Sequence, residues 1–206
     1  MDTVKVRKYD LPDGGLIDTS ATDDDWFFWL PDQAYLILGQ SNKAEKSLYS
    51  ELVIQDEIPV YKRPSGGESV ILTPNTLVIS VRLLSDRLEN PQVYFKRINN
   101  AIINGLASLG INDLGYKGIS DITIGAKKIL GSSIYRKKNL VFYHAVLNVA
   151  EDIDYIAKYL QHPTKEPDYR VGRKHTDFVT SLAEAGHEFS GEQLIKAIEL
   201  EFKKGI

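Results

Sequence analysis

The segment KRPSGGESV at residues 62–70 is the first of four stretches whose residue types can do chemistry. Gly66 and Gly67 let the backbone pass close to a ligand and expose N–H groups to a carboxylate or phosphate oxygen. Arg63 adds a planar cation that can bind such an anion through two parallel hydrogen bonds. The segment lies between two predicted strands, so an ordinary hairpin turn is the alternative, and for one short glycine motif it is the more frequent outcome.

The second stretch, GAKKILGSS at residues 125–133, places two lysines next to each other. On an alternating strand, Lys127 and Lys128 point to opposite faces. One of them must point inward, which is unfavourable unless its ammonium meets an anion. An inward lysine therefore indicates a phosphate or carboxylate ligand, while a lysine that extends its ammonium to water is the alternative.

Two single residues form the third candidate group. Asp121, in the sequence SDI, is of a type that can hold Mg²⁺ between phosphates. His144 lies on an apolar predicted strand, where it can bind a ligand or be a core histidine whose hydrogen bonds are satisfied.

The fourth stretch, residues 166–178, gathers basic side chains just before a predicted helix. Cations near a helix N-terminus can help to hold a phosphate. The alternative is a solvated charged face. The residues concerned are Arg170, Arg173, Lys174 and His175.

Strands and helices alternate around these stretches. Short runs rich in β-branched and aromatic residues predict strands at residues 34–39, 57–63 and 76–84, which we expect to share one sheet. Residues 121–149 predict an antiparallel meander with turns at 125–126 and 137–139.

The helix with the clearest signals follows Asn90 and Pro91 and ends at Gly110. Ser190 and Gln193 form a capping box that begins the last helix. Shorter helices are predicted at residues 41–53, 152–160 and 176–185. Together these elements predict an α+β fold with a mixed, mostly antiparallel sheet flanked by helices. We expect one domain over residues 26–206, after a flexible or loop-like lead-in over residues 1–25.

Composition narrows the class of protein. The chain has 206 residues, 43% of them hydrophobic, which predicts a folded domain. The net charge of −3 argues against a nucleic-acid partner. There is no cysteine, which excludes disulfides and every cysteine nucleophile. The charged N-terminus and the lack of a long apolar run predict a cytoplasmic protein with no membrane partner.

Taken in chain order, these motifs resemble the catalytic domain of the lipoate-protein ligase A family. That family shares its fold with biotin protein ligases and lipoyl or octanoyl transferases, and the fold is similar to that of class II aminoacyl-tRNA synthetases. The resemblance runs over residues 34–160, on the sequences LGQSN at 38–42, KRPSGGESV at 62–70, SDI at 120–122, KILGSS at 128–133 and YHAVLN at 143–148.

The resemblance implies ATP-dependent activation of lipoate or octanoate to an acyl-adenylate, and transfer of the acyl group to a lysine of a lipoyl-carrier domain. Lys128 would be the catalytic residue and would stabilise the charge that develops in both steps. Asp121 would position Mg²⁺ or the nucleotide. The other implied substrate-binding residues are Arg63, Ser65, Gly66, Gly67, Val70, Asn75, Gly131, Ser132, Ser133 and His144.

Departures from the family pattern define the alternatives. Glu68 replaces a glycine, and we expect its carboxylate to pair with Lys62 or Arg63 or to face away from the nucleotide; Leu72 and Thr73 replace a His-Asp pair. Only about forty residues follow Asp168, where many ligases of the family have a C-terminal accessory domain, so the expectation is either a separate accessory ligase subunit for adenylation or a branch that only transfers a preformed adenylate. The rival classes are a transfer-only or non-catalytic acyl-binding homologue and, disfavoured by the lack of cysteine, an octanoyltransferase. Biotin ligase is disfavoured because its Gly-Arg-Gly-Arg-type loop is missing.

Overall fold

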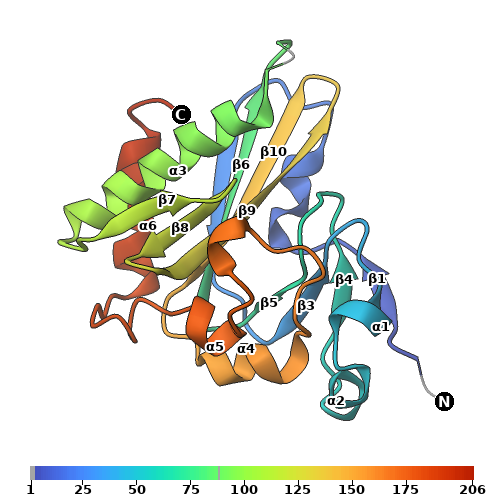
Figure 1. Ribbon diagram of the computed structural model, residues 1–206. Coiled ribbons are helices and arrows are strands. Elements are labelled where there is room, and N and C mark those ends of the chain that lie inside the picture. The colour runs from blue at the N-terminus through green and yellow to red at the C-terminus, as the bar shows by residue number, and fades with distance from the viewer. Residues whose placement is uncertain (1–2, 88) are drawn as a thin grey trace.

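The chain folds into two β-sheets with helices packed against them, which confirms the predicted α+β class (Figure 1). The coordinates are a computed structural model that describes residues 3–87 and 89–206. None of the described helices is long and apolar enough to cross a membrane.

The larger sheet has six strands in the order β2-β6-β10-β9-β8-β7, all paired antiparallel. Its β8-β9-β10 part is the predicted meander, with turns at residues 125–126 and 138–139. The strands are β2 (Asp25–Trp29), β6 (Thr76–Leu84), β7 (Leu114–Lys117), β8 (Asp121–Ile124), β9 (Lys127–Lys137) and β10 (Leu140–Asn148).

The smaller sheet has the order β1-β4-β3-β5, with β1 (Val6–Lys8), β4 (Val60–Lys62), β3 (Tyr35–Leu38) and β5 (Val70–Leu72). The expectation that residues 34–39, 57–63 and 76–84 share one sheet is wrong for the third strand. The nine residues of β6 all pair with the nine of β10, a far longer ladder than a three-residue strand could offer. The backbone turns from one sheet into the other at residues 73–75, where the Thr73 N–H donates to Thr76 Oγ1.

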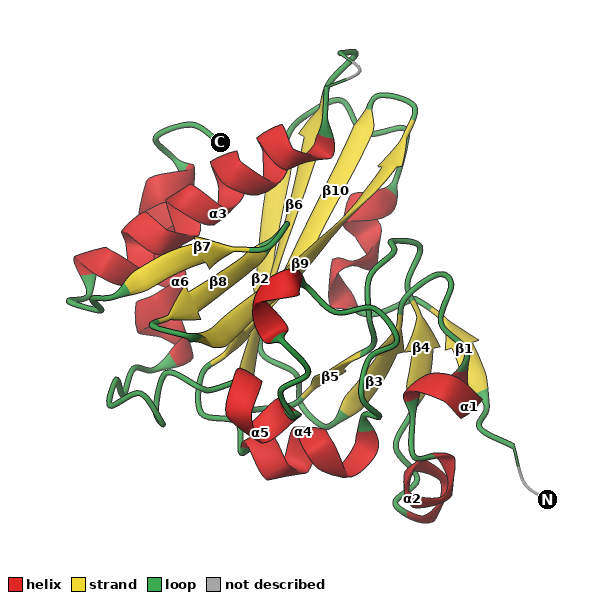
Figure 2. Ribbon diagram, viewed as in Figure 1, coloured by secondary structure: helices red, strands yellow, loops and turns green. Residues whose placement is uncertain are grey.

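Helices α3 (Pro91–Ser108) and α6 (Gly191–Phe202) lie side by side on one face of the larger sheet (Figure 2). Both begin at the predicted caps: the Asn90 side chain accepts from the Gln92 N–H, and Ser190 and Gln193 form the capping box. The two backbones approach closely at Gly105, where a Cβ would lie 2.8 Å from Ile198 Cα. The main apolar core therefore lies between these helices and the sheet.

Shorter helices pack against the smaller sheet in a second apolar cluster. The helix predicted at 152–160 is α4 (Ile153–Tyr159). The one predicted at 41–53 is two helices, α1 (Ala44–Ser47) and α2 (Ser50–Gln55), because Leu48 between them forms a β-bridge with Leu160.

The helix predicted at residues 176–185 is much shorter, α5 (His175–Phe178). It ends because the next residues bond to β9: Val179 bridges Lys128 in parallel, and the Thr180 N–H donates to the Lys128 carbonyl at 2.9 Å. Hydrogen bonds to the sheet replace those of a longer helix.

The N-terminal lead-in also differs from the expected loop. Residues 6–8 form β1, and Pro12–Ile17 form a 3₁₀ helix, η1, packed on the larger sheet. Asp13 is buried there and accepts hydrogen bonds from the hydroxyls of Tyr9, at 2.8 Å, and Ser80, at 2.6 Å. The contact of Asp13 with Ser80 and the pairing of β1 with β4 are long-range, are not signalled by local periodicity, and make residues 6–17 part of the folded structure.

Candidate active site

A cavity of about 200 Å³ lies between the two sheets and under residues 161–175, a segment that we call the strap. Strands of both sheets line it, together with Tyr9 from the N-terminal segment. One end is apolar, with Ile37, Val70, Leu72, Val78 and Val146. The other end, which we call the basic end, carries Lys128, His162, Lys165, Arg170 and His175, beside one carboxylate, Glu68, and the apolar Phe178 and Val179. The cavity thus suits a ligand with an apolar chain and an anionic group.

Strand register fixes the direction of the cavity. Asp121 of β8 pairs with Gly131 of β9, Gly131 with Val146 of β10, and Val146 with Val78 of β6. These four residues form a row across the sheet, and adjacent strands lie about 4.8 Å apart. The row runs from the basic end at Asp121 to the apolar end at Val78.

Lys128 reaches into the basic end. Its Nζ lies 2.8 Å from Asp121 Oδ1, and the Tyr169 hydroxyl donates to Asp121 Oδ2 at 2.8 Å. The amine can take this position because Gly131 has no side chain: a Cβ there would lie 2.6 Å from Nζ. Lys127 points to the other face, where it pairs with Glu184 at 3.3 Å. The predicted opposite orientation of the two lysines is confirmed.

Asp121 was expected to position Mg²⁺ or the nucleotide. Both of its carboxylate oxygens are engaged, one by Lys128 and one by Tyr169. Within residues 3–87 and 89–206, no group of three or more His, Cys, Asp or Glu side chains is arranged to hold a metal ion. In the structure the Asp121 carboxylate therefore positions the Lys128 amine, and its expected role toward Mg²⁺ or the nucleotide stays a prediction, because Mg²⁺ is commonly held by one or two carboxylates together with substrate phosphates.

The 63–68 loop is organised by Arg63, which is 4% exposed. Its Nε donates to Ser65 Oγ at 3.0 Å, and its Nη2 donates to the carbonyls of Gly66, at 2.7 Å, and Glu68, at 2.8 Å. Burial lowers the pKa of Arg63 to about 10, so the side chain stays protonated at neutral pH. The arginine thus directs most of its donors to the loop, while it also lines the cavity, and its expected contact with a substrate stays a prediction.

The loop is not a hairpin turn, because the strands that it joins, β4 and β5, do not pair: β3 lies between them. Gly67 has a φ of +87°, which glycine adopts without strain, and a Cβ there would lie 3.1 Å from Arg63 Nη2. Gly67 lines the cavity with its backbone. The ligand-binding interpretation of this motif fits its geometry better than the turn.

His144 lies beside this loop and is 9% exposed. Its Nε2 lies 2.8 Å from Ser65 Oγ, which is also 3.0 Å from Ser133 Oγ. Burial, aided by the charge of Arg63, lowers the pKa of His144 to about 3, so the ring is neutral. His144 is therefore both a satisfied core histidine and a wall of the cavity. Ser132, next along β9, also lines the cavity and donates to the Ser120 carbonyl at 2.9 Å.

The residues that depart from the family pattern have definite places. Glu68 accepts from Asn42 Nδ2 at 3.3 Å and from the Lys165 N–H at 3.2 Å. These bonds join the 63–68 loop to the strap. Of the two expected outcomes, the pairing with Lys62 or Arg63 is not found, and the orientation relative to a nucleotide stays a prediction. Leu72 is in the apolar wall, and the Thr73 hydroxyl bonds to Glu151.

Asn75 is not brought to the cavity, although it was expected to bind substrate. It is exposed, and its carbonyl accepts hydrogen bonds from the N–H groups of Val149 and Ala150. The reason is that the chain crosses between the two sheets at this point, away from the cavity.

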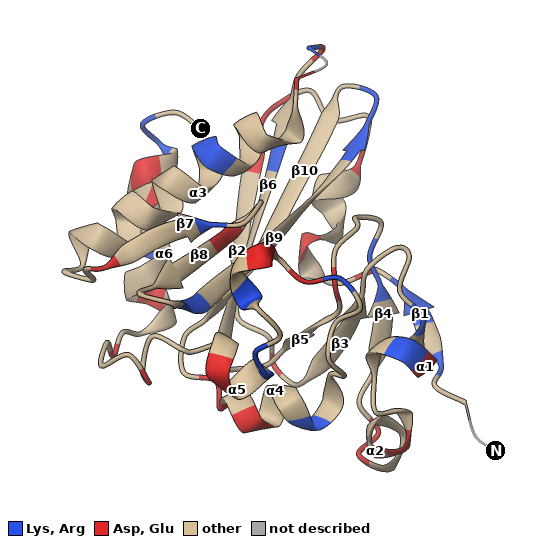
Figure 3. Ribbon diagram, viewed as in Figure 1, with Lys and Arg blue, Asp and Glu red and all other residues tan. Residues whose placement is uncertain are grey.

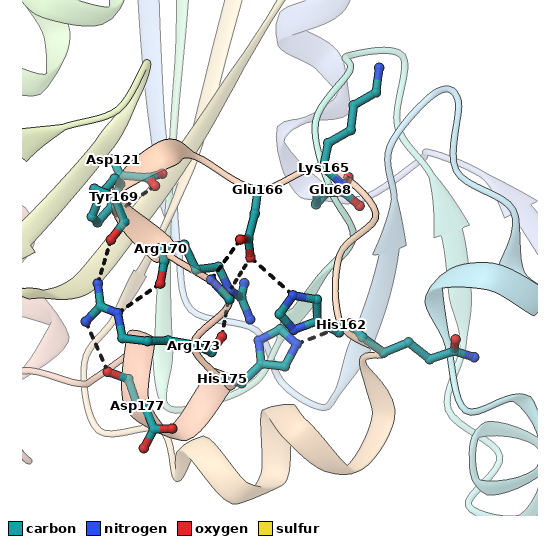
Figure 4. A network of polar contacts seen from close by, with 12 residues as sticks. Glu68, Asp121, His162, Lys165, Glu166, Tyr169, Arg170, Arg173, His175 and Asp177 are labelled. Carbon is teal, nitrogen blue, oxygen red and sulfur yellow. Dashed lines mark hydrogen bonds and ion pairs between the residues drawn. The ribbon is translucent and has the colours of Figure 1, made fainter.

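Arg170 of the short 3₁₀ helix η2 (Asp168–Arg170) points from the strap into the cavity (Figure 4). The guanidinium lies 4.7 Å from the centre of the Phe178 ring, and Nε is 3.5 Å from Glu166 Oε2. Arg170 is 4% exposed, yet its Nη2 has no hydrogen-bond partner among the described residues. A buried guanidinium donor without a partner is unfavourable unless an anionic ligand supplies one.

The rest of the basic cluster has other roles. Arg173 donates to the carbonyls of Tyr169, Arg170 and Ala126, which stiffens the strap. Lys174 is exposed, and His175 lines the cavity with its Nε2 3.2 Å from the Gln161 carbonyl. Figure 3 shows basic and acidic residues interspersed over the elements, the strap included. The cluster is therefore divided between the cavity and the surface.

Sequence reasoning missed Tyr9, Tyr169 and the strap residues His162 and Lys165. Tyr9 lies in a segment without periodicity, so nothing local marked it. Tyr169 adjoins the basic cluster, and its hydroxyl contact with Asp121 spans 48 positions of the chain.

The fold and the site define a class of protein: an α+β domain in which a cavity between two sheets holds a carboxylate-paired lysine between a basic and an apolar end. The chain belongs to the lipoyl protein ligase A/B catalytic domain family, whose model matches residues 16–203. The resemblance noted from the motifs is thereby confirmed.

Relatives at low identity include three named proteins. Lipoate-protein ligase 1 of Staphylococcus aureus is 26% identical over 144 residues, which are 69% of this chain and 43% of that protein. Lipoate-protein ligase A subunit 1 of Thermoplasma acidophilum is 25% identical over 158 residues, 72% of this chain and 60% of that one. Octanoyltransferase LipM of Bacillus cereus is 22% identical over 199 residues, which are 83% of this chain and 70% of that protein. The chain thus spans about half the length of the first two.

Two solved structures share the fold. The bipartite lipoate protein ligase of Thermoplasma acidophilum, from a study of an archaeal lipoylation system with its E2 lipoyl domain, matches with a TM-score of 0.80 at 22% identity, over 92% of this chain and 75% of that one. A lipoate-protein ligase A bound with ATP matches with a TM-score of 0.75 at 22% identity, over 98% of this chain and 83% of that one. The predicted ligase-type fold is confirmed.

Proposed function

We propose that this protein is a lipoate-protein ligase, which uses ATP to convert lipoate or octanoate to the acyl-adenylate and passes the acyl group to a lysine of a lipoyl-carrier domain. The observation that carries the proposal is the cavity that places the Lys128 amine between a basic and an apolar end. An acyl-adenylate has the same division, with an anionic phosphate next to an apolar chain.

Lys128 acts in both half-reactions. In the first, a carboxylate oxygen of the acid bonds to the α-phosphorus of ATP and pyrophosphate leaves. In the second, the carrier amine bonds to the acyl carbon, loses a proton and displaces AMP. The lysine ammonium stabilises the negative charge that develops on the oxygens around these centres. Asp121 keeps the ammonium in place, which lowers the reorganisation needed in each step.

Other cavity residues bind the two parts of the adenylate. The Gly67 backbone and the Ser133 hydroxyl offer donors on the phosphate side, while Val70 borders the acyl chain. Ser65 and His144 hold this wall together through their 2.8 Å contact.

Arg170 supplies a cation for a phosphate. Its burial and its unpartnered Nη2 favour a small anion in the cavity over an acidic surface of the carrier. Lys174, which is exposed at the start of α5, is the better candidate for a carrier contact.

A transfer-only enzyme is the second candidate. The relative from Thermoplasma acidophilum is named as one subunit of a ligase, and a LipM octanoyltransferase also matches. By analogy, adenylation here would need a separate accessory subunit.

One assay tests both candidates. The purified protein is incubated with lipoyl-carrier domains in two arms. One arm contains lipoate, ATP and Mg²⁺, and the other contains synthetic lipoyl-adenylate. The mass of the carrier is then measured by mass spectrometry. Acylated carrier in both arms supports the ligase. Product from lipoyl-adenylate alone supports the transfer-only enzyme, and no product in either arm overturns both.

A further inference from the structure

We propose that Tyr9, held in place by Asp13, closes the apolar end of the cavity and sets the length of the acyl chain that the protein accepts. This inference rests on the proposed function, because it assigns the apolar end to the acyl chain.

Tyr9 is a fixed part of the cavity wall. It is 8% exposed and lines the cavity, and its hydroxyl donates to Asp13 Oδ1 at 2.8 Å. The second carboxylate oxygen of Asp13 accepts from Ser80 Oγ at 2.6 Å, which anchors the carboxylate to β6. On its other side, the ring meets His144 edge-on, with the ring centres 6.2 Å apart. Contacts on both sides therefore hold the ring in one position.

The distance from the reactive lysine to this wall matches a medium acyl chain. The Lys128 amine lies over Gly131, and Val78 lies two strands away in the same row, at β6. Two strand spacings span about 10 Å, which is close to the length of an extended octanoyl chain. Tyr9 packs in the same buried cluster as Val78 and Leu72. A chain with additional carbons would meet the Tyr9 ring.

The buried carboxylate behind Tyr9 supports a dedicated role. Asp13 is 1% exposed, and a carboxyl group is rarely buried unless its oxygens are hydrogen-bonded or paired. Here its two oxygens accept hydrogen bonds from the hydroxyls of Tyr9 and Ser80. Asp13 is thus a positioning residue that fixes the end wall.

The test compares acyl-chain profiles of Tyr9→Leu, Tyr9→Trp and the control Tyr35→Leu. Tyr35 lies in the same buried cluster but does not line the cavity. For each protein, calorimetry measures the binding of hexanoate, octanoate, decanoate and dodecanoate, and kcat/KM is measured for their transfer to a carrier domain. Thermal unfolding shows which variants are folded.

Tyr9→Leu should raise the decanoate-to-octanoate ratio by roughly 15-fold, since each newly buried methylene is worth roughly fourfold in affinity. Tyr9→Trp should shift the preference toward hexanoate, which keeps the proposal testable if the leucine variant does not fold. Tyr35→Leu should lower stability and keep the wild-type profile.

The outcomes separate the two proposals. Wild-type protein that neither binds fatty acids nor acylates a carrier would show that the proposed function is wrong. An active wild type whose folded Tyr9 variants keep its chain-length profile would overturn the role of Tyr9 alone, as would an equal shift in Tyr35→Leu.

Discussion

The Lys128 amine is held over Gly131 by the carboxylate of Asp121, with 2.8 Å between Nζ and Oδ1. This ion pair joins β9 to the neighbouring β8 and leaves the lysine side chain 28% exposed toward the cavity. The pair therefore aims a cation at the place where a ligand would bind, and the first two predictions follow from it.

Lys128→Ala should lower acyl transfer by at least about 10²–10³-fold, the effect expected on losing a group that stabilises charge in the transition state. The free energy of unfolding should change little, since the lysine is partly exposed and packs in no core. Lys127→Ala, on the opposite face, is the matched control and should keep its rate. Carrier mass and urea unfolding measure the two quantities, and equal damage from both variants would contradict the assignment.

Gly131→Ala should impair activity through Lys128. The new Cβ would lie 2.6 Å from Nζ and 2.8 Å from Cε, so the lysine must leave its position beside Asp121. The backbone at Gly131 does not have a positive φ, and we expect the free energy of unfolding to change by less than about 1 kcal/mol. Gly14→Ala, with no atom within 4 Å of its Cβ, is the control. Full activity in Gly131→Ala would show that the position of the amine is unimportant.

Arg170→Ala should raise KM for ATP by about 10- to 100-fold, because a hydrogen bond to a charged group contributes about 1.5–3 kcal/mol. Transfer from preformed lipoyl-adenylate should depend on it less if Arg170 binds the departing pyrophosphate. Lys174→Ala should leave KM for ATP unchanged and should weaken carrier binding, most visibly at low salt. If Lys174→Ala raised KM for ATP and Arg170→Ala weakened carrier binding instead, the two residues would have each other's role.

His144 should make stability fall in acid. Its pKa is about 3 in the folded protein, against 6.5 for an unperturbed histidine, so the unfolded chain takes up a proton below pH 6.5 that the folded protein does not. The free energy of unfolding should therefore decrease by up to about 1.4 kcal/mol per pH unit between pH 6.5 and 3 from this group. Urea unfolding at several pH values measures the slope. In His144→Gln the slope in this range should be smaller by the contribution of one proton, and an unchanged slope would contradict the assignment.

Local sequence signals predicted the elements that are stabilised locally. Helix α3 begins at the predicted Asn90-Pro91 cap and ends just before Gly110, and the β8-β9-β10 meander has its predicted turns. The signals failed where distant segments compete. The early end of α5 depends on bonds to β9, and the separation of β6 from β3 depends on its ladder with β10.

The same limit applies to the site. Lys128 and the 63–68 loop could be found because motif and alternation mark them. Residue type alone could not distinguish Arg170, which enters the cavity, from Arg173, which bonds to backbone carbonyls. Asn75 was misplaced because its position depends on the crossing between the sheets, and Tyr9 was missed because its wall position depends on a fold-back of the N-terminus.

The cavity walls come from both ends of the chain, from Tyr9 to Val179. A nascent chain therefore cannot complete the cavity until α5 has left the ribosome, and an N-terminal fragment lacks part of the cavity wall. Because a ligand that binds only the complete fold stabilises it by mass action, acyl ligands would act as a selective folding aid for finished molecules. Fragments and misfolded chains would gain nothing from the same ligand.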